Sequence, residues 1–145
     1  MKRVAIGAGL IVTLAFAAAA LANIRHYHGH TEGGGKVRFV TKVRGDGEAT
    51  KVRRFVFNRV PMQCDDGGST VGDAGNPPPA MKVNDENRFH GKFTSPSGKK
   101  HFNIRGRLTD DDQKARGILR VNGNFGGGAT NCHTGKTHWR AKHGG

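Results

Sequence analysis

Apolar side chains recur at every second position over long stretches of this chain, and that spacing restricts it to β-structure. The segments 36–43, 101–108 and 115–121 each place most of their apolar residues on one side of an extended strand, as a half-buried strand requires. After residue 22, no stretch has helical spacing over several turns. We therefore predict an all-β fold of about seven to nine short antiparallel strands. The expected strands are residues 36–43, 51–60, 80–83, 87–93, 101–108, 115–121 and a last strand from Cys132 through Ala141.

Three glycines, Gly91, Gly106 and Gly117, lie on the apolar faces of successive predicted strands. Glycine inside a strand marks a tight bend or a close approach between backbones. The sheet is therefore expected to coil strongly, as a small antiparallel β-barrel or a curled β-sandwich. Within residues 51–60 the apolar alternation shifts, which predicts a bulge at Arg53-Arg54.

The first 22 residues have the parts of a secretory signal peptide in the expected order. Lys2 and Arg3 form a positive start, residues 4–20 form an apolar run, and Ala20-Leu21-Ala22 matches the small-x-small cleavage pattern. A membrane anchor is the alternative, but the run is short and rich in alanine for a spanning helix of about 20 residues. We predict a helical signal peptide over residues 1–22, cleavage after Ala22, and a secreted protein that is extracellular or held at the cell envelope. No second apolar segment follows, so no transmembrane segment is expected after cleavage.

The remainder divides into a lead-in and one domain. Residues 23–35 are rich in His and Gly and are predicted to form a flexible lead-in that ends at Gly33-Gly34-Gly35. Residues 36–143 have the length of a single β domain. Its modest apolar content and abundant glycine indicate a small core that an extra restraint would stabilise.

The chain has two cysteines, Cys64 and Cys132. In an oxidising compartment they allow only one intramolecular disulfide, which the chain-entropy model values at about 4 kcal/mol. Free thiols and an intermolecular bridge are the alternatives. A metal site at these cysteines is disfavoured because the chain has no C-x-x-C spacing.

Positive charge is concentrated on the solvent faces of the predicted strands. The net charge is +13, or +11 without Lys2 and Arg3, and every acidic residue falls in the lead-in or in a loop. A basic sheet face attracts anionic polymers or lipid headgroups by releasing their counterions, and a merely solubilising surface is the alternative. Aromatic platforms for stacked bases are absent from this face, which disfavours nucleic acid. The candidate polyanion-binding residues are Arg38, Arg88, Lys92, Arg105, Arg107, Arg116, Arg120 and Arg140.

Three histidines alternate in the lead-in. In an extended chain, His26, His28 and His30 point to one side, where neutral imidazoles could bind Zn²⁺ or Cu²⁺. The alternative is a polar terminus that binds no metal. No other cofactor is indicated.

Signatures of enzymes are missing. The chain contains no G-x-S-x-G, H-E-x-x-H or phosphate-cradling loop, so no catalytic residues are predicted. Its acidic residues are spread over separate loops, which disfavours a pair of catalytic carboxylates. We predict a secreted, non-catalytic β module that binds anionic envelope or extracellular polymers. The alternatives are an exported metal-binding protein that uses the histidines and a hydrolase with an unrecognised site.

A series of short motifs runs along nearly the whole chain after residue 22. They are residues 52–57 before Cys64, 89–93, 106–108, 115–119, and Cys132-His133-Thr134-Gly135 with Trp139-Arg140-Ala141. The order of these motifs resembles a group of small, uncharacterised secreted bacterial β-rich proteins with one disulfide and a C-x-T-G-x-x-x-W-x-A ending. The resemblance implies export, a β fold and a Cys64–Cys132 bridge, and it implies no activity and no catalytic residues.

Overall fold

The computed structural model describes residues 24–74, 77–109, 111–125 and 130–144. The predicted signal peptide lies outside the described residues. Those residues contain eleven β-strands, and none of them belongs to a helix long and apolar enough to cross a membrane. The strands are β1 (Ile24–Thr31), β2 (Lys36–Val43), β3 (Ala49–Asn58), β4 (Val60–Cys64), β5 (Ser69–Gly72), β6 (Met81–Lys82), β7 (Arg88–Thr94), β8 (Lys100–Leu108), β9 (Lys114–Gly123), β10 (Cys132–His133) and β11 (Thr137–His143).

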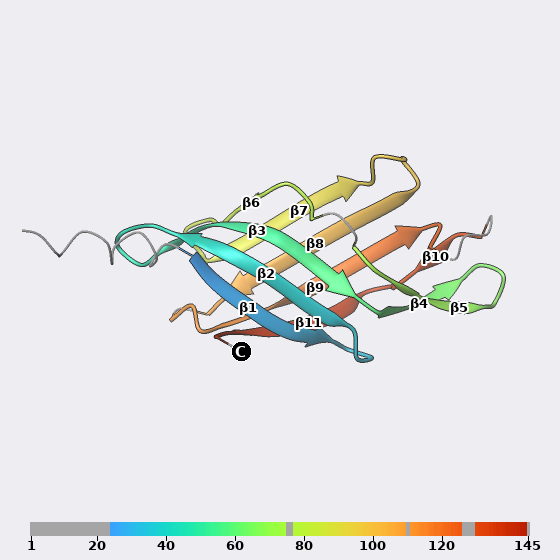
Figure 1. Ribbon diagram of the computed structural model, residues 1–145, viewed down its shortest axis with the longest axis horizontal. Coiled ribbons are helices and arrows are strands. Elements are labelled where there is room, and N and C mark those ends of the chain that lie inside the picture. The colour runs from blue at the N-terminus through green and yellow to red at the C-terminus, as the bar shows by residue number, and fades with distance from the viewer. Residues whose placement is uncertain (1–23, 75–76, 110, 126–129, 145) are drawn as a thin grey trace, which may run out of the picture.

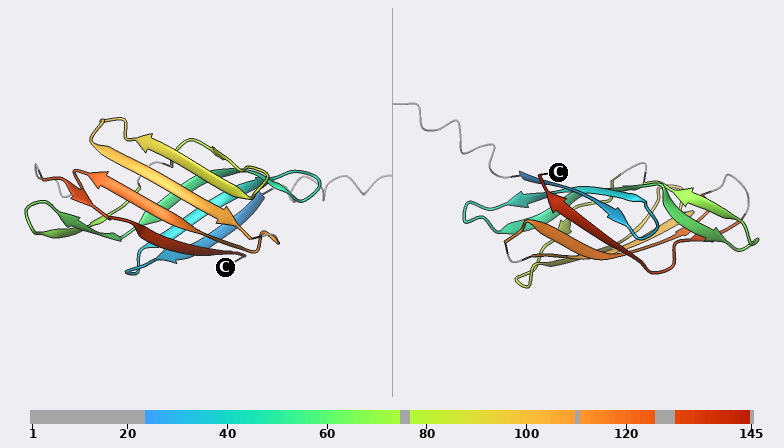
Figure 2. Two further views of the ribbon diagram at one scale, coloured as in Figure 1. Left: turned by 180° about the vertical axis from the view of Figure 1, so that it is seen from behind. Right: turned by 90° about the horizontal axis from the view of Figure 1, so that it is seen from below.

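All eleven strands belong to one antiparallel sheet that folds over on itself. Strands β7, β8 and β9 form one layer, and β1, β2 and β3 form the other (Figure 1). Strand β11 pairs with both β9 and β1 and so joins the two layers along one side (Figure 2). Strands β10, β4 and β5 extend the sheet beyond the end of β9. The all-β antiparallel prediction is confirmed.

The sheet does not close into a barrel, so that predicted form is wrong. In space, the gap between β3 and β7 is bridged among the described residues by the two-residue strand β6, which pairs with β3. A single isolated bridge, Val83–Phe89, then reaches β7. Pro77, Pro78 and Pro79 precede β6. Because proline has no backbone N–H, this segment cannot continue a ladder between the two layers.

The strand count exceeds the expected seven to nine because several strands are very short. Strand β5 was not among the expected strands, and it pairs with β4. The last predicted strand is divided into β10 and β11, which are separated by a turn where Gly135 has a φ of 63°. The predicted bulge in β3 is confirmed. There the register with β2 shifts, and Arg54 has a φ of 52°.

Residues 24–31 are strand β1 and not a flexible lead-in. Strand β1 lies inside the sheet, paired with β11 on one side and β2 on the other. Tyr27 and Thr31 point inward and are buried, whereas His26, His28 and His30 point outward. The alternation of inward Tyr27 with outward histidines is typical of a strand. The polar composition of the segment made this alternation hard to recognise in the sequence.

Aromatic side chains fill the space between the two layers. Trp139 of β11 is fully buried at the centre, with ring centroids 5.7 Å from Phe39, 5.4 Å from Phe55 and 6.1 Å from Phe89. Tyr27 stacks on Phe39 at 4.6 Å. These contacts bring β1, β2, β3, β7 and β11 together, and aromatic pairs at such distances stabilise a core beyond the area that they bury.

Two glycines make room for Trp139. Register pairs place Phe89, Gly106, Gly117 and Trp139 in one row across β7, β8, β9 and β11 on the inner face. A Cβ atom on Gly117 would lie 1.9 Å from the carbonyl oxygen of Arg105 and 2.6 Å from Cζ2 of Trp139. Only a residue without a side chain fits at this position.

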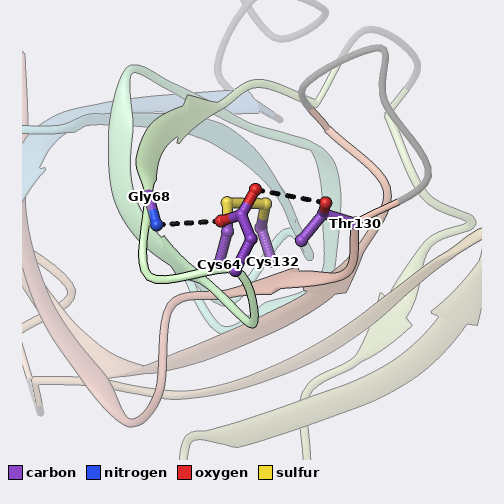
Figure 3. Close-up of a disulfide and its surroundings, with 5 residues drawn as sticks. Cys64, Gly68, Thr130 and Cys132 are labelled. Atoms are coloured by element: carbon purple, nitrogen blue, oxygen red, sulfur yellow. Dashed lines mark hydrogen bonds between the residues drawn. A yellow bond between two sulfur atoms is a disulfide. The ribbon is translucent and has the colours of Figure 1, made fainter.

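The disulfide joins Cys64 of β4 to Cys132 of β10, across 68 positions of sequence, as predicted. The two cysteines are direct register partners. The carboxylate of Asp66 connects the two segments that carry the disulfide. Its Oδ1 accepts a hydrogen bond from the backbone N–H of Gly68 at 2.8 Å, and its Oδ2 accepts one from the hydroxyl of Thr130 at 3.2 Å (Figure 3). The bridge is consistent with an oxidising, extracellular environment.

A buried carboxylate connects β1 to the turn between β8 and β9. Asp112 is buried in that turn with a φ of 53°. Its Oδ2 accepts from Nη1 of Arg25 at 2.6 Å, and its carbonyl oxygen accepts from the Tyr27 hydroxyl at 2.6 Å. Burial raises the pKa of Asp112, and the nearby Arg25 opposes that rise.

Replacing Gly117 with Ala should destabilise the protein by about 1–3 kcal/mol, because the added Cβ overpacks the core. Gly45→Ala is the matched control, since no atom lies within 4 Å of its added Cβ. Chemical denaturation of the two variants measures the difference. Equal stability of both would show that Trp139 does not depend on the glycine row.

Replacing Arg25 with Gln removes the cation beside the Asp112 carboxylate. At neutral pH we expect the free energy of unfolding to fall by about 1–3 kcal/mol. Without Arg25, the pKa of Asp112 rises further above its ordinary value. The Asp112 carboxyl group then holds its proton more tightly in the folded state than in the unfolded state. The fall in the free energy of unfolding should therefore become smaller on acidification. Urea titrations at neutral pH and at about pH 3 test this. A loss of equal size at both pH values would contradict the role of Asp112. The exposed Lys136→Gln, in the turn between β10 and β11, serves as control.

Candidate anion-binding face

Four arginines stand side by side on the outer face of the sheet. Arg88 of β7 pairs in register with Arg107 of β8, Arg107 with Arg116 of β9, and Arg116 with Arg140 of β11. We call these four residues the arginine row. Their strands lie next to one another in the view from behind (Figure 2, left). The register continues from Arg140 to His30 of β1 and then to Lys36 of β2.

The arginine row places like charges directly opposite each other, which is an unfavourable cross-strand arrangement. All four arginines are exposed. Arg88 is 3.2 Å from Glu86, and no ion pair involving Arg107, Arg116 or Arg140 occurs within the described ranges. The protein therefore keeps several adjacent cations without neutralising them from its own described residues.

Open hollows flank the row on both sides. One, of about 920 Å³, is lined by all four arginines together with Arg105, Ile118 and His138. The other, of about 910 Å³, is lined by Arg107, Arg116 and Arg140 together with His28, Lys114 and Lys142. A ligand on the row would thus have accessible space on both sides of Arg107, Arg116 and Arg140.

The remaining predicted polyanion-binding residues surround the row. Arg105 and Arg120 lie on the same strands as Arg107 and Arg116 and point to the same face. Lys92 lies on β7, where its register partner Asn103 is itself paired with Arg120. Arg38 is on β2, separated from the row, and is paired with His28.

His30 and Lys36 were not among the predicted binding residues, although they continue the register of the row. The strand pattern alone shows that both side chains face solvent. Their alignment with Arg140 depends on β1 pairing with both β11 and β2. Such pairing between distant strands leaves no local signal in a sequence.

A contact between His138 and Glu32 lies at the margin of this face. The Nδ1 atom of His138 is 3.1 Å from Oε2 of Glu32. Hydrogen bonding to His138 lowers the pKa of Glu32, and Arg140 contributes to the same direction of shift. Among the described lining residues of both hollows, Glu32 is the only carboxylate.

Aromatic side chains are directed away from the arginine row. Trp139 and Phe89, the chain neighbours of Arg140 and Arg88, are buried on the inner face. Phe93 and Phe102 are partly buried against the core. In the described part of the chain, Trp139 is the only Phe, Tyr or Trp side chain among the residues that line the two hollows. The face therefore lacks the exposed stacking platforms of single-strand nucleic-acid-binding proteins.

The three candidate metal-binding histidines share the outer face of β1 but do not form a cluster. Alternate residues of a strand are about 6.8 Å apart. His28 is paired with Arg38 and Lys142, and His30 with Lys36 and Arg140. No group of three or more His, Cys, Asp or Glu side chains suited to a metal ion is present among the described residues. Binding of Zn²⁺ or Cu²⁺ by these histidines stays a prediction.

Comparison with known proteins leaves the function to be argued from this geometry. No family model matches the chain. No curated protein matches it either. The arrangement of charges on the outer face is the feature from which we propose a function.

Replacing Arg116 with Gln should stabilise the isolated protein by about 0.5 kcal/mol at low ionic strength, because it removes repulsion from Arg107 and Arg140. The gain should disappear in about 1 M salt, where the screening length is near 3 Å. Thermal unfolding at the two salt concentrations measures it. A variant less stable than the parent at low salt would show that the row stabilises the fold.

Proposed function

We propose that this protein is an exported, non-catalytic β module that holds an anionic polymer or a layer of anionic headgroups on its arginine row. The main support is the unfavourable alignment of Arg88, Arg107, Arg116 and Arg140. A bound polyanion would turn this mutual repulsion into attraction. A solubilising surface needs no such alignment, since scattered charges serve that purpose equally well.

The chemistry of arginine suits this role. Each guanidinium group is planar, always charged, and presents paired N–H donors that match the oxygens of phosphate or carboxylate. Much of the binding free energy would come from counterions released by the polymer. Affinity would therefore depend strongly on salt.

Binding without catalysis is favoured by the composition of the hollows. Glu32 is the one carboxylate among their described lining residues, and it is already paired with His138. Hydrolysis through general acid and base groups usually requires two suitable groups near the reacting bond. The proposed module thus concentrates or anchors a polymer and leaves it intact.

The proposed location is outside the cytoplasm. The Cys64–Cys132 disulfide is consistent with an oxidising environment, and the first 22 residues have the pattern of an export signal. The polyanions available there include wall polymers, acidic polysaccharides and anionic lipid headgroups. A basic face would keep the exported protein close to any of these surfaces.

The purified protein should bind long-chain polyphosphate at low ionic strength, and the affinity should fall with a log–log salt slope of about −3, as expected for roughly four single-strand phosphate contacts. Fluorescence anisotropy with a labelled polymer measures both quantities. Arg116→Gln should weaken binding and make the slope shallower by about 0.7. Lys51→Gln, on β3 and outside the row, is the control for loss of one charge. Absence of binding to polyphosphate, polygalacturonate and anionic vesicles at low salt would contradict the proposed function.

A further inference from the structure

We propose that the arginine row binds a linear phosphate polymer lying across the strands, with neighbouring phosphate groups held by arginines of neighbouring strands. This inference rests on the proposed function and adds to it the direction, the minimum length and the chemical class of the ligand. It follows from the register of β7, β8, β9 and β11. Strand pairing sets the distances between arginines of neighbouring strands, because the backbone hydrogen bonds hold the arginine Cα atoms in place.

The dimensions of the row define a minimum ligand. Adjacent strands are about 4.8 Å apart, so the four arginines span three strand spacings, or roughly 14 Å. With His30 and Lys36 the row extends over five spacings, roughly 24 Å. A single phosphate ion can contact one or two members, whereas a chain of at least 14 Å can contact all four arginines at once.

The direction across the strands is favoured because this path has the longest run of basic residues on the described strands, with six register partners from Arg88 to Lys36. The neighbouring register line from Lys114 to Arg38 has four basic residues. Along β9, the outward residues after Lys114 and Arg116 include Ile118, which breaks the line of charge. One register row away, Ile118 lies between Arg105 and His138, and His138 is paired with Glu32. In the arginine row, by contrast, every strand from β7 to β2 contributes a basic residue.

The shape of the row favours a flexible single chain. The row begins on the layer of β7, β8 and β9, continues on β11, and reaches β1 and β2 of the opposite layer (Figure 2). A ligand that follows it must bend around the side of the molecule. Duplex DNA is stiff over about 150 base pairs, and a single strand of nucleic acid would lack stacking partners for its bases.

Phosphate fits the spacing better than carboxylate. One arginine fork can satisfy both oxygens of a planar carboxylate. A tetrahedral phosphate directs its free oxygens apart, so that guanidinium groups on two adjacent strands can donate to the same group. Arg107, Arg116 and Arg140 are exposed register partners on neighbouring strands, so adjacent pairs of them could each share a phosphate group.

A length series tests this inference. Calorimetry or anisotropy competition with diphosphate, tripolyphosphate and longer polyphosphates should show affinity rising by roughly tenfold or more up to the length that spans four arginines. Beyond that length the affinity per chain should level off. An affinity that depends only on total phosphate concentration would overturn the inference. Oligogalacturonates of matched length form the second arm, and tighter binding of these carboxylate chains would overturn the assignment to phosphate.

Two double variants separate the row from general positive charge. R107Q/R116Q removes two members of the row, and R105Q/R120Q removes two arginines from the same strands outside it. The first should abolish the dependence on chain length, whereas the second should lower all affinities by a similar, smaller factor. Equal effects of both pairs would overturn the inference while leaving a basic binding face intact. Failure of the parent protein to bind any polyanion would instead overturn the proposed function.

Discussion

The packing of Trp139 against Gly106 and Gly117 is the constraint on which the rest of the structure depends. It lets the Trp139 ring lie against β8 and β9 at the centre of the core, in contact with both layers. The same contact fixes the register of the sheet. A slip of one residue would expose Trp139 and bury a charge, since successive residues of a strand point to opposite faces.

That register also creates the outer face. Each member of the inner row is the chain neighbour of a member of the arginine row: Phe89 follows Arg88, Gly106 precedes Arg107, Gly117 follows Arg116, and Trp139 precedes Arg140. Core packing and charge alignment are therefore two consequences of one strand pairing. The repulsion between the arginines is tolerated because the aromatic core holds the strands in place.

Much of the architecture was predictable from local pattern. The alternation of apolar residues identified β2, β7, β8 and β9, and the shifted parity near Arg54 identified the bulge of β3. Strand β1 was not identified, because three histidines and a glycine surround Tyr27, and its stability comes from pairing with β11 and β2. Strand β5, with four residues, is too short to show a periodicity and was not identified. It forms by pairing with β4.

For the binding face, the sequence by itself determined which side chains are basic and that Arg88, Arg107, Arg116 and Arg140 point to solvent. It also determined that two cysteines were available for one bridge. Only the tertiary structure decided that these four arginines, from strands as distant in sequence as β7 and β11, lie in a single row, and that the sheet folds into two layers without closing. The physical reason is that alternation is encoded within each strand, whereas register and strand order are settled by contacts between strands, above all by the fit of Trp139 over two glycines.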